Sequence, residues 1–192
     1  LIFTYYLHAQ MNLARSKPIA FNKENLFIIQ IPQSEIHWAA YNSDSRIEVF
    51  KSRLLSIPAV SAAVRIDDRT FTGIEYLISG GVNWPGKDDN FNPSYVSFSA
   101  DASILKVLGL KIVSGRWFFL DDPLRDTNNV VLNQSAVKKF NLGKDVVGMR
   151  FQNGNVIGVV EDFAISGIKS EVPAVVFNVD GPRTGGILVQ FD

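Results

Sequence analysis

Cysteine is absent from this chain of 192 residues, and histidine occurs only twice. The absence of cysteine excludes disulfide bonds, thiolate catalysis and cysteine-ligated zinc together. An excess of either charge is also lacking, because 19 Lys and Arg balance 19 Asp and Glu. A net charge of zero provides no electrostatic footprint for nucleic acid, so we expect no such partner. No apolar run reaches the roughly 18 residues that predict a membrane-spanning helix.

The short motifs that identify common enzyme classes are missing as well. The sequence has no G-x-S-x-G, no Walker A sequence and no Rossmann glycine fingerprint. His8 and His37 are too far apart to form a pair at helical spacing. The pairs Asp67-Asp68, Asp88-Asp89 and Asp121-Asp122 are typical of turns, with an adventitious calcium site as the alternative. We therefore expect no catalytic residue, no cofactor and no metal centre.

Two polar motifs have a chemical and a structural interpretation. Glu161-Asp162 follows the apolar run Val156–Val160, as a catalytic carboxylate pair does in some α/β enzymes. No accompanying base or phosphate loop is present, which favours helix capping or bracing between subdomains. Asn133-Gln134-Ser135 matches a glycosylation sequon, but its place before an apolar helical pattern favours an N-cap at Asn133.

The apolar residues that are present predict a folded α/β core. Hydrophobic residues make up 46% of the chain and include 14 Phe. Phe27–Ile31 and Val60–Ile66 are expected strands, and between them a helix capped by Asp44 ends at Pro58. A strand, a helix and a strand at this spacing predict a βαβ unit with adjacent parallel strands.

The second half of the chain is expected to alternate short strands and short helices. Gly80 to Pro93 is rich in turn dipeptides and predicts an exposed loop at a subdomain boundary. Asp101 is expected to cap a helix that Gly109 ends, and Asn133 one that Gly143 ends. Asn153-Gly154 predicts a hairpin. The remaining expected strands are 95–98, 110–113, 130–132, 156–160, 174–179 and 187–191.

The expected core follows from these helix and strand faces. Its members are Leu54, Leu55, Leu105, Leu108, Val137, Phe140, Ile157 and Val159. Trp117 is expected to anchor a subdomain core, with ligand stacking as the alternative. Trp84 and Lys87, in the turn-rich loop, are the candidates for contact with a partner or ligand.

The first residues have helical spacing, with apolar side chains at Phe3, Leu7, Met11 and Ala14 before Pro18. One interpretation is an amphipathic helix packed on its own domain. The other is the outer end of a transmembrane helix, since Tyr5 and Tyr6 suit a membrane–water interface.

Several motifs follow one another along the chain, namely Gln10-Met11-Asn12, Phe21–Leu26, Pro58-Ala59-Val60, Trp84-Pro85-Gly86-Lys87, Leu108-Gly109-Leu110, Gly115-Arg116, Val131-Leu132-Asn133, Val156–Phe163 and Pro173. This ordered series resembles the extracytoplasmic domain of MacB-like and FtsX-like ABC transporter permeases across almost the whole chain. The chain departs from the family pattern at Ala20 and Ala59, where glycine is usual.

The resemblance implies a non-enzymatic part of a membrane transporter with a mixed α/β fold in two subdomains. Residues 1–17 would be a stalk helix that continues the first transmembrane helix. Residues 18–80 and 155–192 would form a βαβ-based, porter-like subdomain, and 81–154 a smaller, sabre-like inserted one.

The resemblance also implies a location and partners. The permease would lie in the bacterial inner membrane, with this domain in the periplasm. Its partners would be a cytoplasmic ATP-binding subunit and a second permease copy, with room for a periplasmic adaptor or substrate. ATP-driven movement would then serve export or mechanotransmission. Two alternatives remain, a periplasmic ligand- or peptide-binding module that uses the Trp84 loop, and a hydrolase that uses Glu161 and Asp162.

Overall fold

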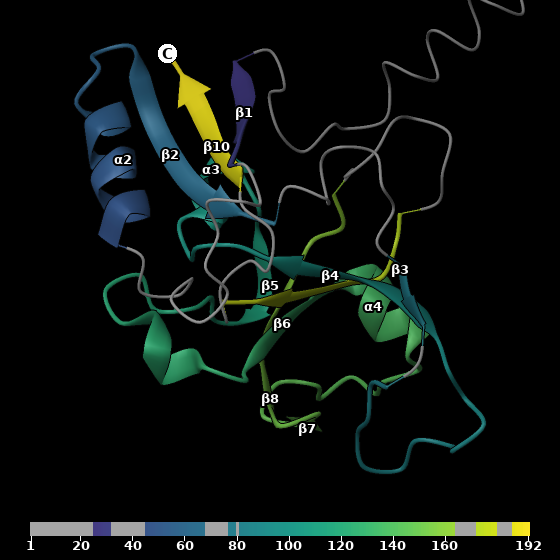
Figure 1. Ribbon diagram of the computed structural model, residues 1–192. Helices are drawn as coiled ribbons and strands as arrows, with labels where there is room; N and C mark the ends of the chain where they lie inside the picture. The colour runs from purple at the N-terminus through teal and green to yellow at the C-terminus, as the bar shows by residue number, and fades with distance from the viewer. Residues whose placement is uncertain (1–24, 32–44, 68–76, 80, 164–171, 180–185) are drawn as a thin grey trace, which may run out of the picture.

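The strands in the described part of the chain form two sheets (Figure 1). The computed structural model describes residues 25–31, 45–67, 77–79, 81–163, 172–179 and 186–192. The three-stranded sheet has the order β1 (Leu26–Gln30), β10 (Gly186–Phe191), β2 (Val60–Ile66). The seven-stranded sheet has the order β3 (Leu77–Ser79), β4 (Ser94–Ser99), β9 (Val175–Asn178), β6 (Val130–Asn133), β8 (Gly154–Val160), β5 (Ile112–Gly115), and β7 (Arg150–Phe151) pairs with β8. The expected mixed α/β class is confirmed, whereas the expected stalk helix lies outside the described residues.

The first sheet corrects the expected βαβ unit. Helix α2 (Ser45–Leu55) does connect β1 to β2, but β10 lies between them and is antiparallel to both. β1 and β2 are therefore parallel to each other without being adjacent. The central residues of β10 explain this order, because Ile187, Leu188 and Val189 are all almost fully buried. A strand that is apolar on both faces needs the central position of a sheet.

The two faces of the first sheet pack on different partners. Ile187 and Val189 face α2 and contact Ile47 in one apolar cluster. Leu188 points to the opposite face, as alternation along a strand requires, and joins a larger cluster. That cluster contains Val64 and Ile66 of β2 together with Phe98 and other residues of the second sheet. The two sheets thus share one core.

Short helices cover the faces of the second sheet. Helix α3 (Ile104–Val107) packs within the shared core, and α4 (Gln134–Lys139) packs against the other face. The 3₁₀ helix η4 (Pro123–Asp126) precedes β6. Figure 1 shows the first sheet above the second, with the β7–β8 hairpin at the end farthest from the C-terminus.

Most of the expected core residues are buried or partly buried. Leu108, Phe140 and Val159 are buried. Four others are partly buried against the core clusters, namely Leu54, Leu105, Val137 and Ile157. Leu55 was wrongly assigned, since 49% of its surface is exposed. At about 100° per residue, Leu54 is nearly in phase with the buried Ile47, whereas Leu55 is rotated by roughly 80°.

Two helix ends differ from expectation. Ser103, not Asp101, occupies the N-cap position of α3, because the Asp101 carboxylate accepts hydrogen bonds from Lys51 and Arg65 instead. Helix α4 ends at Lys139, four residues before Gly143. The positive φ that follows the helix, 53°, belongs to Asn141. The expected stop at Gly109 is confirmed, with a φ of 60°.

The expected hairpin is present between β7 and β8. Phe151 pairs with Gly154, so the loop consists of Gln152 and Asn153, with Gln152 at a φ of 51°. The turn is therefore one residue earlier than the Asn-Gly motif indicates.

The expected subdomain boundaries remain a prediction. Strands β8 and β9 follow residue 154 in sequence but pair within the second sheet. A division that follows the sheets would place 26–66 and 186–191 in one unit and 77–178 in the other. We call these the first-sheet unit and the second-sheet unit.

Candidate functional site

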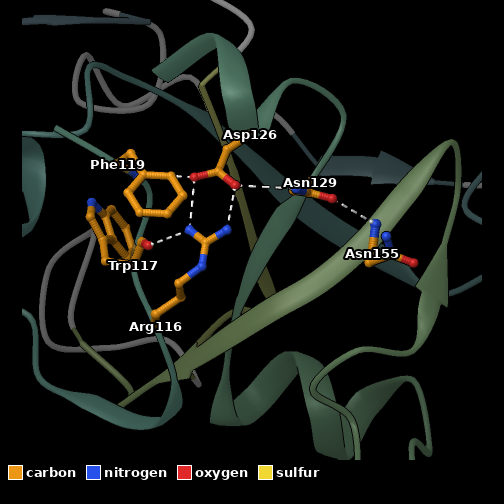
Figure 2. Close-up of polar contacts among 6 residues, drawn as sticks. All are labelled: Arg116, Trp117, Phe119, Asp126, Asn129 and Asn155. Atoms are coloured by element: carbon orange, nitrogen blue, oxygen red, sulfur yellow. Dashed lines mark hydrogen bonds and ion pairs between the residues drawn. The ribbon is translucent and has the colours of Figure 1, made fainter. Parts of the chain in front are cut away.

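The main polar network of the second-sheet unit is built on Arg116 and Asp126 (Figure 2). Arg116 directly follows β5, and Asp126 is the last residue of η4. Arg116 Nη1 donates to Asp126 Oδ2 at 2.8 Å, and Nη2 donates to Oδ1 at 2.7 Å. The Asp126 side chain has no exposed surface, whereas 43% of the Arg116 side chain remains exposed. A two-point bond of this kind fixes orientation as well as distance.

Asp126 also holds the loop between β5 and β6. Its Oδ2 accepts a hydrogen bond from Phe119 N at 3.0 Å, and its Oδ1 accepts one from Asn129 Nδ2 at 3.2 Å. The hydrogen bond from Arg116 lowers the pKa of Asp126 against the opposing effect of burial. The same bond raises the pKa of Arg116. Both groups are therefore charged at neutral pH.

The network extends on both sides of the ion pair. The Phe119 ring contacts two guanidinium groups, with Arg116 Cζ 4.2 Å and Arg125 Cζ 4.5 Å from its centroid. Asn129 continues the network by accepting a hydrogen bond from Asn155 N on β8 (Figure 2). One buried carboxylate thus links the end of β5, η4 and the start of β8.

Trp117 is confirmed as a core anchor. Its side chain is buried, and its Nε1 donates to Ala102 O at 2.7 Å. The indole packs against Phe118 and Phe177 at centroid distances of 5.0 and 5.3 Å. A satisfied, enclosed indole is unsuited to stacking a ligand.

Two glycines bring β5 and β8 into close contact. A Cβ atom on Gly158 would lie 2.2 Å from Arg116 O, and one on Gly115 would lie 2.3 Å from Ile157 O. Gly115 also has a φ of 70°, which favours glycine. The motifs Gly115-Arg116 and Val156–Phe163 are therefore two sides of one backbone contact.

Asp162 has the helix-capping role, one of the two structural roles that the sequence favours, because it binds the first turn of α4. Its Oδ1 accepts hydrogen bonds from Ser135 N and Asn133 Nδ2, both at 2.8 Å, and its Oδ2 accepts one from Ser135 Oγ. Glu161 and Asp162 are both exposed residues that follow β8.

Asn133 is confirmed as the cap of α4. Its Oδ1 accepts hydrogen bonds from Ala136 N and Val175 N, and its Nδ2 also donates to Pro173 O. The residue has no exposed surface. A fully enclosed side chain rules out the sequon as a surface glycosylation site in the folded domain.

Trp84 and Lys87 lie in a loop that contacts the β7–β8 hairpin. Only 8% of Trp84 is exposed, and its ring stacks on Phe140 and Phe151 at 5.5 and 5.9 Å. Lys87 Nζ lies 5.9 Å from the Trp84 ring centroid. Phe91, in the same loop, is 38% exposed and meets Trp84 edge to face. Phe91 is therefore exposed on this loop and Lys87 partly exposed, whereas Trp84 is buried beneath them.

The other candidate residues that the structure describes form no common site. His8, His37 and Asp68 lie outside the described residues. Asp88 is exposed and accepts a hydrogen bond from Asn90 N at 2.7 Å, as expected of a turn residue. Within the described ranges, no group of three or more His, Cys, Asp or Glu residues is placed to bind a metal ion.

Sequence reasoning singled out Arg116 but missed its partner. Asp126 lies in a polar loop with four other acidic or amide residues nearby, namely Asp121, Asp122, Asn128 and Asn129. Nothing in that pattern marks one of them as fully buried. The one feature that could have indicated a buried carboxylate was Arg116, since an arginine among apolar neighbours needs an anionic partner.

The fold and its network define a two-sheet α/β domain whose polar side chains fasten loops and strand ends. The chain belongs to the family of MacB-like periplasmic core domains, whose sequence model matches residues 2–190. It is therefore a periplasmic domain of a MacB-like ABC transporter permease. The match is thus to a family of transporter permease domains and not to an enzyme family. No curated protein matches the chain.

Solved structures show the same fold. The chain is similar to the periplasmic region of MacB from Actinobacillus actinomycetemcomitans, with a TM-score of 0.58 and 19% identity over 92% of this chain and 79% of that one. It is also similar to the extracellular domain of the noncanonic ABC-type transporter YknZ from Gram-positive bacteria, with a TM-score of 0.56 and 15% identity over 88% and 84%. Among the described residues, no helix is long and apolar enough to cross a bilayer.

Proposed function

We propose that this domain transmits ATP-driven movement from the membrane into the periplasm, as part of a permease that serves export or mechanotransmission. In the arrangement that the family implies, the domain is placed between two transmembrane helices of an inner-membrane permease. The permease would pair with a cytoplasmic ATP-binding subunit and with a second copy of itself.

The observation that supports this function is the position of the two ends of the domain. Leu26 at the start of β1 pairs with Gln190 near the end of β10, so the entering and leaving strands are neighbours. Phe191 N donates to Asn25 O at 3.0 Å, and Asp192 N donates to Ala59 O at 3.1 Å. Movement of either flanking helix would therefore act on the same three-stranded sheet.

Cross-linking of the stalks in the full permease tests this function. We expect that cysteines replacing Gln10 in both copies, once oxidised, block transport and leave ATP binding intact. This domain contributes no cysteine of its own, so the introduced pair reports cleanly. Reduction of the bond should restore transport. Unchanged transport with the stalks locked would contradict the proposal and favour passive ligand binding.

We also propose that loop 81–93 contacts a periplasmic partner, either an adaptor or a substrate. The loop is fixed to the β7–β8 hairpin, because Gln152 N donates to Asn83 O at 2.7 Å. Phe91 is exposed on the loop, and Lys87 is partly exposed. In the full permease, Lys87→Glu should lower transport more than Lys144→Glu, a control that makes the same charge change at an exposed lysine. Equal effects would contradict a contact at this loop.

A further inference from the structure

The two sheet units are joined at one edge of β2. Ile66 forms an antiparallel bridge with Ala100, just beyond the end of β4. Asp67 N donates to Ser99 O, and Asp101 N donates to Arg65 O, both at 2.9 Å. The backbone hydrogen-bonding groups of Arg65 and Asp67 face the same neighbouring segment, because alternate residues of an antiparallel strand bond to the same side. The edge of the first sheet is thus continued by residues of the second-sheet unit.

The Asp101 side chain adds two contacts to this junction. Its Oδ2 accepts a hydrogen bond from Arg65 N at 3.0 Å and forms an ion pair with Lys51 Nζ at 2.5 Å. Asp101 therefore binds both the N–H and the C=O of Arg65. Lys51 belongs to α2, and only 15% of its side chain is exposed. One carboxylate thus connects α2, β2 and the turn between β4 and α3.

The other contact between the units is apolar. Val64, Ile66 and Leu188 of the first-sheet unit share a cluster with Phe98, Leu108 and Trp117 of the second. Apolar packing is non-directional, so it opposes separation of the units more strongly than sliding or rotation. Hydrogen bonds and ion pairs have preferred directions. The polar junction is therefore the part of the contact that can set the angle between the units.

We propose that Asp101 fixes the angle between the first-sheet unit and the second-sheet unit, so that the two units move together as one rigid body. This inference rests on the proposed function, in which movement enters through β1 and β10. Because β10 is hydrogen-bonded to β2, that movement reaches the Arg65–Asp101 contact within the same sheet. Figure 1 shows β2 running from the level of the C-terminus toward β4. Without the Asp101 contacts, the first-sheet unit would turn against the second and part of the movement would be lost.

Distance measurements by pulsed electron paramagnetic resonance on this chain test the coupling. Spin labels on Ser61→Cys and Lys138→Cys place one label on each unit, since Ser61 is exposed on β2 and Lys138 is exposed on α4. In Asp101→Ala we expect a distance distribution about twice as broad as in the parent chain. A second label pair, Lys111→Cys and Lys138→Cys, lies within the second-sheet unit and should stay unchanged. Asp145→Ala, which removes an exposed carboxylate elsewhere, should leave both distributions unchanged.

Two milder variants keep the test independent of folding defects. Asp101→Asn retains an acceptor for Arg65 N and loses the ion pair, and Lys51→Met loses the same ion pair from the other side. Both should broaden the distribution by less than Asp101→Ala, provided that thermal unfolding shows a folded domain. An inter-unit distribution that stays narrow in all folded Asp101 variants would overturn the inference.

The same variant in the full permease separates this inference from the proposed function. We expect Asp101→Ala to lower transport several-fold while ATP hydrolysis continues, which is the behaviour of an uncoupled transporter. A narrow distribution overturns the role of Asp101 and leaves the proposed function untouched. A broadened distribution with unchanged transport would instead contradict transmission through this domain.

Discussion

At the scale of single residues, Asp126 combines complete burial with hydrogen bonds to three other residues. Its fully buried carboxylate accepts hydrogen bonds from Arg116, Phe119 and Asn129. A buried charge is unfavourable unless its partners replace water. The loop between β5 and β6 therefore depends on a complete set of donors around one residue.

Removal of the counter-ion should cost more than removal of the charge. Arg116→Met leaves the Asp126 carboxylate buried and unpaired, and we expect a loss of about 3 kcal/mol or more in the free energy of unfolding. Asp126→Asn retains a side-chain oxygen for Phe119 N, and we expect a loss of about 1–3 kcal/mol. Urea unfolding of both variants and of the double variant measures the coupling. Additive losses would contradict a direct ion pair.

The pH dependence follows from the same contacts. Because the folded-state pKa of Asp126 lies below the usual aspartate value of 3.8, the carboxylate stabilises the fold above that value. The stability is lost as the pH falls through the lower, folded-state pKa. We expect the difference in unfolding free energy between the parent chain and Asp126→Asn to be constant above about pH 5 and to shrink below about pH 4. A difference that grows on acidification would show that the sign is wrong.

At the scale of elements, the pairing of β5 with β8 depends on glycine. A Cβ on Gly158 would lie 2.2 Å from a backbone oxygen, whereas one on Gly143 would meet nothing within 4 Å. Gly158→Ala should therefore destabilise the domain by about 1–3 kcal/mol, since backbone must move to admit the methyl group. Gly143→Ala, the matched control, should change stability by less than about 1 kcal/mol. Thermal unfolding compares them, and equal effects would contradict the close approach.

Helix phase gives a second prediction at this scale. Leu108 has no exposed surface, whereas 49% of Leu55 is exposed. We expect Leu108→Ala to cost about 2–5 kcal/mol in unfolding free energy, because it leaves a cavity in the shared core. Leu55→Ala should cost less than about 1 kcal/mol. Chemical denaturation measures both, and similar losses would show that the outer face of α2 is wrongly assigned.

The elements also show what the sequence could and could not predict. Continuous apolar runs predicted β2, β8 and β10 well, because local periodicity is visible in one sequence. The order β1–β10–β2 was missed, since the pairing of distant strands depends on tertiary packing. Asn133 was recognised as a cap because its partner is three residues away, whereas Asp101 and Asp126 bind groups that only the fold brings near.

At the scale of the whole molecule, the domain is a pair of sheets with a shared core and a polar junction. Its entering and leaving strands lie together in the first sheet, and loop 81–93 and the β7–β8 hairpin belong to the second-sheet unit. This arrangement supports the proposal that the domain receives movement at the first sheet and transmits it to the second-sheet unit. The Asp101 junction is the proposed link between the two.

The most direct test of transmission is the distance between two copies of the domain in the full permease. A spin label on Ser61→Cys gives one inter-copy distance, because each copy carries a single label on its first-sheet unit. Transmission predicts that the distance distribution shifts when a non-hydrolysable ATP analogue replaces ADP, and that the shift persists with a label at Lys138→Cys on the second-sheet unit. Identical distributions in both nucleotide states would contradict the account.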